Sequence, residues 1–189
     1  MKKRVLFNLL LTSFVFSFSC QNASQDASDF SYKIENGGII MTGYHGSIKD
    51  VKIPGEIKGL PVLSIGERAF QGNELTSIVI GDSVETIGFA AFFNNKLTSV
   101  VIPNSVKTIE DYAFANNQLT NAVIGNSVET IGNLAFFNNK LTNVVIPNSV
   151  KTIGDYAFAN NQLTNIVIPG SAVVEAGAFD YDVKITLRK

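Results

Sequence analysis

The sequence predicts a repeat solenoid of short parallel strands, and three observations carry this prediction. A 22-residue unit recurs four times without interruption, which is the signature of units that stack to bury their apolar faces. Units one and three agree at 18 of 22 positions and units two and four at 20 of 22, so the duplicated block spans 44 residues. Each unit combines strand-favouring Val and Ile with an Asn pair typical of turns. The units are Ile80–Val101, Ile102–Val123, Ile124–Val145 and Ile146–Val167.

The first element is an export signal over residues 1–19. A basic start at Lys2 to Arg4 precedes an apolar run from Val5 to Phe18. This run is shorter than the ~20 residues that span a bilayer and is typical of the apolar region of a signal peptide. The polar residues that follow predict a flexible tether, so residues 20–29 are assigned to the tether and its first residue, Cys20.

Cys20 is the only cysteine, which excludes a disulfide within the chain. Its position after Ser19 resembles the lipidated cysteine of bacterial lipoprotein signal peptides, and the resemblance implies a membrane anchor at Cys20. The sequence departs from that pattern at Ser17, where Leu is usual. Ordinary cleavage after Ser19, which would leave an unlipidated secreted protein, is the alternative.

An N-terminal cap is predicted next, over residues 30–52. Phe30, Tyr32 and Ile34 alternate with polar residues, and Asn36-Gly37 follows before a second apolar run. Asn-Gly between two such runs is a strong β-hairpin signal. We expect this hairpin to close one end of the solenoid.

Residues 53–187 are assigned to the solenoid. Its first coil, Ile53 to Val79, aligns with the regular units if the five residues Lys58 to Val62 form a surface insertion. Its last coil is degenerate, begins at Ile168 and carries Ala178-Phe179. We expect Val183 to Leu187 to form the final strand.

Side-chain directions within a coil follow from strand alternation. Leu119, Ala122 and Ile124 are expected to face the core, and Phe136 to anchor it from a short helical turn, Leu134-Ala135-Phe136. The pair Asn138-Asn139 is expected to reverse the chain, since Asn tolerates the left-handed conformation and bonds nearby backbone. One position alternates in charge from coil to coil, which predicts stacked opposite charges: Glu85, Lys107, Glu129 and Lys151.

The candidate binding surface is a ribbon of outward-facing residues on successive strands. One row is valine and a second is Ser or Asn: Val79, Val101, Val123, Val145 and Val167, beside Ser77, Ser99, Asn121, Asn143 and Asn165. Exposed valines beside a polar row fit docking of a partner protein. The alternative is that Val serves strand propensity alone, since scattered apolar surface is normal.

Other classes of function find little support in the sequence. Without the first 19 residues the chain has 12 basic and 16 acidic residues and no basic stripe, so nucleic acid is not an expected partner. His45 is the only histidine and supports no nucleophile motif, and the adjacent pair Glu110-Asp111 becomes Gly154-Asp155 in its repeat. No metal-ligand spacing or phosphate-binding loop occurs, so no catalytic residue, metal or cofactor is assigned.

The repeat resembles the bacterial leucine-rich repeat of BspA-like surface proteins. The resemblance rests on Ile-Pro, Val-x-x-Ile-Gly and Ala-Phe within Leu141 to Phe158, and on the leader Ile34 to Tyr44. The Cys that many family repeats carry after Ala-Phe is Asn or Gly here. The resemblance implies a leucine-rich repeat fold and, since family members include adhesins, a host matrix or plasma protein such as fibronectin or fibrinogen as ligand.

Two functions follow as expectations. The first is a surface-displayed, lipid-anchored module that binds a host or neighbouring-cell protein through the ribbon. The second is an envelope-structural lipoprotein on the periplasmic side of a membrane, without a host ligand. Repeats this similar are compatible with both.

Overall fold

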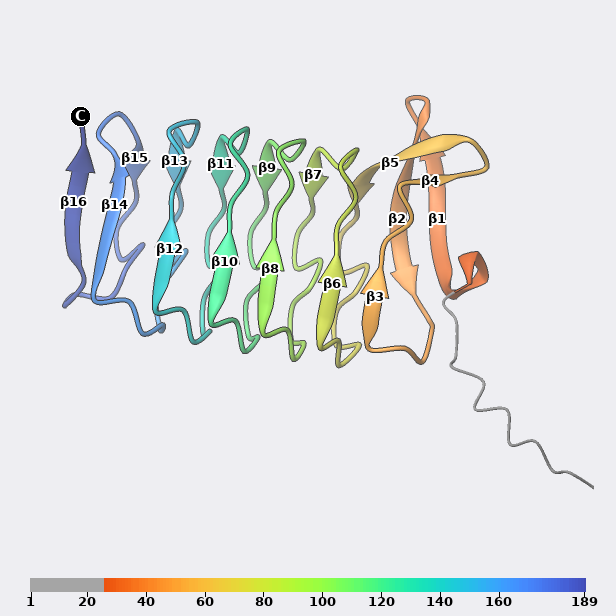
Figure 1. Ribbon diagram of the computed structural model, residues 1–189, viewed down its shortest axis with the longest axis horizontal. Helices are drawn as coiled ribbons and strands as arrows, with labels where there is room; N and C mark the ends of the chain where they lie inside the picture. Colours follow the sequence, from red (N-terminus) through yellow and green to blue (C-terminus); the bar gives the residue numbers. More distant parts are fainter. Residues whose placement is uncertain (1–25) are drawn as a thin grey trace, which may run out of the picture.

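The computed structural model describes residues 26–189, which form a solenoid whose coils stack along one long axis (Figure 1). Each regular coil contributes one strand to each of two long faces. The strands of the first face lie side by side along the molecule: β3 (Asp50–Lys52), β6 (Ser77–Val79), β8 (Ser99–Val101), β10 (Asn121–Val123), β12 (Asn143–Val145), β14 (Asn165–Pro169) and β16 (Lys184–Arg188). The predicted solenoid of short parallel strands is confirmed.

The second face is one continuous sheet behind the first. Its strands pair in the order β1 (Phe30–Glu35), β2 (Gly38–Tyr44), β5 (Leu60–Ile65), β7 (Thr86–Ile87), β9 (Thr108–Ile109), β11 (Thr130–Ile131), β13 (Thr152–Ile153) and β15 (Val173–Val174). From β2 onward the pairing is parallel, and each regular coil meets the equivalent residue of the next, as Thr108 meets Thr130. The 22-residue period therefore sets the register of both faces.

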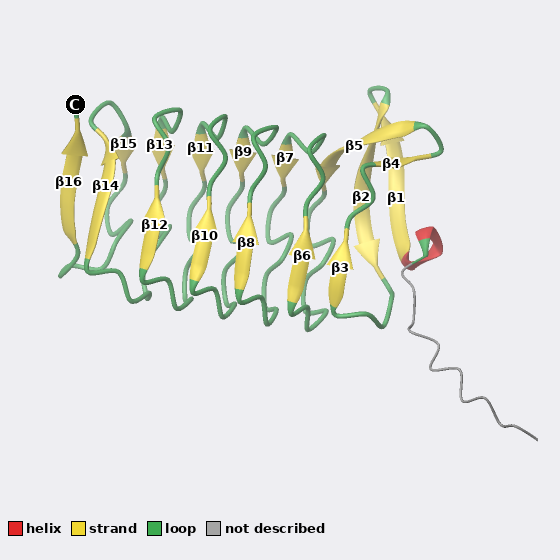
Figure 2. Cartoon of the chain, viewed as in Figure 1, coloured by secondary structure: helices red, strands yellow, loops and turns green. Residues whose placement is uncertain are grey.

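The N-terminal end is closed by the expected hairpin of β1 and β2. Asn36 and Gly37 have φ values of 51° and 79°, the left-handed pair that a two-residue turn between twisted strands requires. A single turn of 3-10 helix, η1 (Ala27–Asp29), precedes the hairpin and is the red element of Figure 2. Phe30 and Tyr44 are buried and pack on the ring of Phe70 in the first coil.

The insertion in the first coil lies slightly earlier than its predicted position. β4 (Glu56–Ile57) pairs with the start of β5 around a turn at Lys58-Gly59. Because Ile65 pairs with Ile87, Val62 occupies the place of Val84 and is fully buried. Assigning Val62 to a surface insertion is therefore wrong, since strand pairing makes it a core residue.

A column of stacked phenylalanine rings runs through the core. The centroids of consecutive rings lie 5.1–5.5 Å apart from Phe70 to Phe179. The expected inward residues Leu119, Ala122 and Ile124 are buried around it, and Phe136 is fully buried as its anchor. The members of the column are Phe70, Phe92, Phe114, Phe136, Phe158 and Phe179.

The segment that carries each core phenylalanine is not helical, which corrects the expected helical turn at Leu134 to Phe136. Leu134 has a φ of 53°, a left-handed value rare for a bulky side chain. Its N–H donates to the carbonyl of Asp155 and the N–H of Phe136 to that of Ala157, both in the next coil. A helical turn would direct these N–H groups along the segment, so bonding between coils selects the irregular conformation.

The C-terminal end lacks a cap comparable to the hairpin within residues 26–189. β16 pairs in parallel with β14, as expected for a final strand. Ile185 and Leu187 align with the buried Ile166 and Ile168, yet they are 47% and 62% exposed. The two ends of the solenoid are therefore closed to different degrees.

Candidate protein-binding surface

The predicted ribbon lies on the first face, across β6, β8, β10, β12 and β14. The first three residues of each strand are exposed, buried and exposed in turn. In β10, Ala122 faces the core while Asn121 and Val123 face solvent. Equivalent residues pair in register across β8, β10 and β12, and β6 and β14 lie beside these strands, so the outward side chains line up in two rows. We call Val79, Val101, Val123, Val145 and Val167 the valine row, and Ser77, Ser99, Asn121, Asn143 and Asn165 the polar row.

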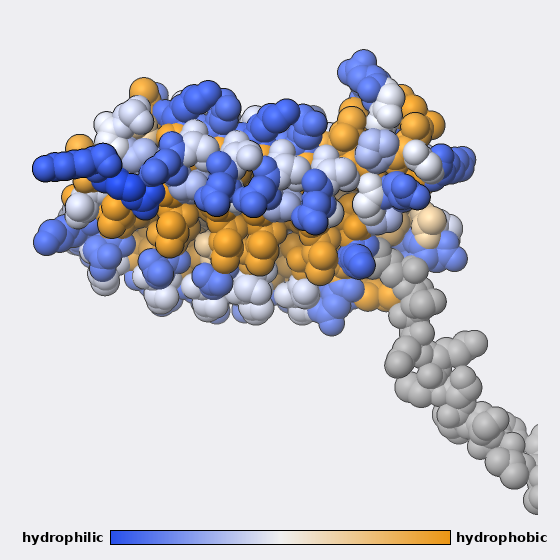
Figure 3. All heavy atoms as spheres, turned by 45° about the horizontal axis from the view of Figure 1, so that its top comes forward, coloured by the Kyte–Doolittle hydropathy of each residue, from blue (hydrophilic) through white to orange (hydrophobic). Residues whose placement is uncertain are grey.

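The valine row is an apolar band along the length of this face (Figure 3). Its side chains are between 41% and 62% exposed. One exposed valine is ordinary, but five on neighbouring strands form an apolar strip, which marks interaction surfaces more often than bulk surface.

The polar row leaves hydrogen-bonding groups available to a partner. Among residues 26–189, the side chains of Ser77, Ser99, Asn121 and Asn143 bond no other protein group, and only Asn165 does, through a neighbouring threonine. Amide and hydroxyl groups can each donate and accept. The ribbon thus presents an apolar strip next to unused polar groups.

A shallow hollow of about 500 Å³ lies over the middle of the ribbon. Its floor includes Gly125, which follows β10 at a place where the neighbouring coils carry Pro103 and Pro147. A Cβ at Gly125 would stand 2.4 Å from the Pro103 carbonyl oxygen. Only glycine fits there, so the alternation between Gly and Pro in successive units shapes this surface.

The charged side chains that alternate along the second face pair with each other within the protein. Lys107 Nζ lies 2.7 Å from Glu85 Oε2, and Lys151 Nζ lies 2.6 Å from Glu129 Oε2, as the alternating charges predict. The hydrogen bond to Glu85 and the charge of that carboxylate raise the pKa of Lys107. The threonines that line this face in β7, β9, β11 and β13 are half-buried.

The Asn pairs serve the turns, as expected. In each pair the first Asn is left-handed, with φ between 54° and 58° in the four regular units. The second is turned inward: Asn139 Nδ2 donates to the carbonyls of Phe114 and Phe136, and its Oδ1 accepts from Leu119 N–H. These bonds link adjacent coils, so Asn139 is a structural residue rather than a ligand contact.

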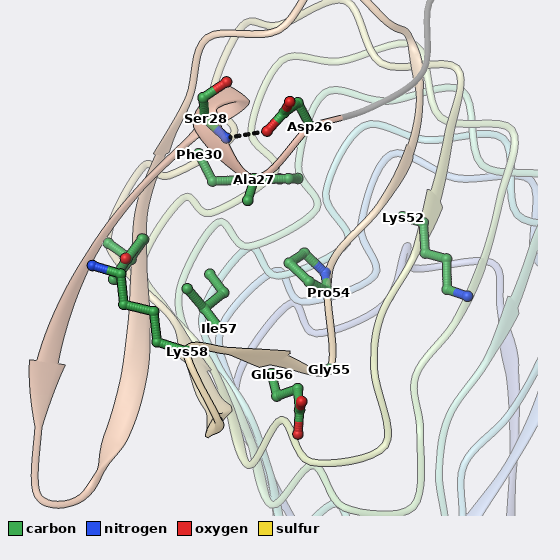
Figure 4. Close-up of a pocket in the computed structure, with 11 residues that line it drawn as sticks. Asp26, Ala27, Ser28, Phe30, Lys52, Pro54, Gly55, Glu56, Ile57 and Lys58 are labelled. Carbon is green, nitrogen blue, oxygen red and sulfur yellow. Dashed lines mark hydrogen bonds between the residues drawn. The ribbon is translucent and has the colours of Figure 1, made fainter.

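A larger hollow, of about 820 Å³, lies beside the N-terminal hairpin (Figure 4). Ala27 and Phe30 line one side of it, and Pro54 and Ile57 line the other. The charged side chains around it, such as that of Glu56, extend away from the apolar interior. This hollow is an apolar recess without a set of polar groups converging on one point.

Residues with catalytic potential do not assemble into a reactive site among residues 26–189. Ser31 Oγ lies 2.7 Å from His45 Nε2, a pair that sequence spacing did not reveal because a bulge shifts the hairpin register. The other ring nitrogen of His45 has no side-chain partner within residues 26–189, so nothing orients the ring, whereas an activated nucleophile needs an oriented base. Glu110 accepts the backbone N–H of Phe89, and Asp111 accepts that of Asn133.

No group of three or more His, Cys, Asp or Glu side chains within residues 26–189 is arranged to hold a metal ion. No helix in the same range has the length and apolar character needed to cross a membrane. The predicted signal peptide, Cys20 and most of the tether lie outside the described residues. They remain predictions from sequence.

The known proteins that this chain is similar to agree with the solenoid fold described above. Residues 63–186 match the family described as BspA type leucine rich repeat region, in six copies. A leucine rich repeat protein from T. pallidum is similar in structure, with a TM-score of 0.69, 27% identity and 85% of each chain covered. No curated protein matches the sequence.

Two further crystal structures are similar in fold alone. A leucine rich cell surface protein from Faecalibacterium prausnitzii A2-165 has a TM-score of 0.54 at 23% identity, with 80% of this chain and 49% of that chain covered. A leucine-rich repeat protein from Eubacterium ventriosum ATCC 27560 has a TM-score of 0.54 at 20% identity, with 85% of this chain and 42% of that one covered.

Proposed function

The chain belongs to the BspA type leucine-rich repeat family, and we propose that it is an exported module that binds a protein through its ribbon. Repeat stacks of this kind are generally protein-interaction modules. The observation that carries the proposal is the exposed valine row beside polar side chains that lack protein partners. An enzymatic role has no comparable support, because no nucleophile, base and orienting group meet among residues 26–189.

The proposal includes a lipid anchor at Cys20 and display on the outer surface of the cell. Its support is the basic and apolar start of the chain, the single cysteine directly after it and the polar tether that follows. Such a tether would hold the solenoid away from the membrane and leave the ribbon accessible. The partner class we propose is a host matrix or plasma protein.

Protease treatment of intact cells tests the display. Loss of the solenoid while a periplasmic marker survives is the expected result. Protection of the solenoid, in cells whose permeabilised counterparts lose it, would refute display and favour an envelope-structural lipoprotein.

Deletion of one 44-residue block, Ile80 to Val123, tests the ribbon as the binding surface. Each coil packs mainly on its neighbours, so the shortened chain should fold, with circular dichroism like that of the parent. Binding to immobilised matrix or plasma protein should weaken because the deletion removes two strands of the ribbon, β8 and β10, with Val101 and Val123. Unchanged affinity of the folded deletion would exclude the ribbon.

A further inference from the structure

Both rows of the ribbon continue onto the end strands, and there they acquire charge. Asp50 of β3 pairs with Ser77, and Lys184 of β16 pairs with Asn165, so the polar row ends in an acid on one side and a base on the other. The valine row ends at Lys52 and Thr186. Between these ends both rows are uncharged.

The spacing of the rows restricts what can bind along them. Paired strands lie about 4.8 Å apart, so equivalent side chains repeat at that interval where the ribbon strands pair, as β8, β10 and β12 do. A single extended strand presents side chains on one face only every ~6.6–6.8 Å. Its side chains would fall out of step with the valine row within a few coils. A second stack of strands repeats at the same interval and stays in step along the whole ribbon.

We propose that the ribbon also binds a second copy of this chain, packed face to face with the first. This proposal rests on the ribbon as the binding surface of the proposed function and adds a second occupant to the matrix or plasma protein named there. The two copies are related by a two-fold axis parallel to the strands, which reverses the solenoid direction. Valine then faces valine, polar row faces polar row, and Asp50 of each copy faces the partner's Lys184.

Charge and polarity favour this arrangement over the other face-to-face one. A two-fold axis along the solenoid would place the valine row of one copy against the polar row of the other. The chosen arrangement forms two ion pairs, one at each end, and keeps apolar groups together. Any shift along the rows by a full coil would separate both ion pairs, so the charged ends also set the register.

The expected association is weak. Three residues from each of the seven strands cover an area about 30 Å by 10 Å, so the interface buries roughly 600–1,000 Å² in total, in the range of transient contacts. We expect a dissociation constant of about 10–100 μM for the full-length chain. Sedimentation equilibrium over about 5 μM to 1 mM covers this range.

Charge reversal supplies the sharpest test. Asp50→Lys and Lys184→Asp each place like charges together at both ends, and each should weaken the dimer about 3- to 30-fold. The double variant Asp50→Lys/Lys184→Asp should recover parental affinity. An equimolar mixture of the two single variants should form a heterodimer, because every charged contact is then complementary.

A second pair of variants locates the contact on the ribbon. Val123 lies at the middle of the valine row, where the two-fold axis places it against Val123 of the second copy. Val123→Asp would bring two carboxylates together there and should weaken the dimer at least about tenfold. Val173→Asp is the matched control, since Val173 is 59% exposed on the second face, and it should leave the dimer unchanged. Circular dichroism confirms that each variant folds.

The outcomes separate this inference from the proposed function. A monomer at every concentration, or a dimer that the charge reversals and Val123→Asp leave intact, would overturn the second copy as partner. If Val123→Asp still abolished binding to a matrix or plasma protein, the ribbon would remain a binding surface for another class of protein. If Val123→Asp changed neither dimerisation nor binding to a matrix or plasma protein, both proposals would fail.

Discussion

The two long faces of the solenoid repeat at the same interval and differ in what their outward side chains contact. On the second face, Lys107 and Lys151 pair with carboxylates of the preceding coil, and the threonines are half-buried. On the first face, the valines remain exposed and the Ser and Asn side chains of the polar row are almost entirely unpaired within residues 26–189. The charged groups of the second face are paired within the protein, whereas the first face exposes an apolar strip beside unused polar groups, so the first face is the one suited to a partner.

The largest effect should come from the core that both faces share. Phe114→Ala removes a fully buried ring from the middle of the phenylalanine column, and we expect a loss of about 3–5 kcal/mol in unfolding free energy. Urea denaturation measures it. Because both faces pack on this ring, both should lose structure together; separate transitions for the two faces would contradict a single core.

The next largest effect should come from the turn that links coils. Asn139→Ala leaves the carbonyls of Phe114 and Phe136 and the N–H of Leu119 without their side-chain partner. We expect a loss of about 1–3 kcal/mol. Asn138→Gly is the matched change beside it, at an exposed position whose φ of 54° glycine adopts without strain, and should cost less. Equal losses would show that the inward bonds of Asn139 contribute nothing particular.

A smaller effect is expected at the hairpin that closes the N-terminal end. Tyr44 donates a hydrogen bond to the Ile48 carbonyl, so Tyr44→Phe should cost about 0.5–1.5 kcal/mol at neutral pH. Burial, and after it the charge of Asp29, raises the pKa of Tyr44.

The pH dependence at Tyr44 follows from the sign of that pKa shift. A folded pKa above the unfolded one gives stability that is complete below the ordinary tyrosine pKa of about 10 and is lost as pH rises through the folded value. The variant should therefore lose less stability between pH 8 and 11 than the parent. Urea midpoints at both pH values measure this, and parallel losses in the two proteins would contradict it.

The smallest effect should be electrostatic and confined to the second face. Lys107→Glu replaces the ion pair with Glu85 by repulsion, and the melting temperature should fall slightly at low salt. Because the pair is exposed, salt should screen most of the difference. Calorimetry at two ionic strengths checks this, and a salt-independent difference would point to packing instead.

Much of this organisation could be predicted from the repeat itself. A fixed period with strand alternation is sufficient to place Ala122 inward and Val123 outward, and to stack Lys107 beside Glu85. The features that sequence reasoning missed depend on bonds between coils. Leu134 is left-handed because its N–H reaches the next coil, which local propensity does not encode.

The irregular ends were harder to predict for a related reason. Val62 belongs to the core because β5 pairs with β7, and Asp50 and Lys184 join the polar row because β3 and β16 pair with regular strands. None of the three lies within the four regular repeats, so the period could not align them. The contact between Ser31 and His45 likewise depends on a bulge in the hairpin.

Photo-crosslinking on intact cells tests most directly which face binds. The full-length chain carries p-benzoylphenylalanine at Val123, on the ribbon, or at Thr130, on the second face, and adducts are read after illumination. We predict an adduct from position 123 and none from position 130. An adduct from position 130 alone, or equal adducts from both, would contradict the ribbon as the binding surface.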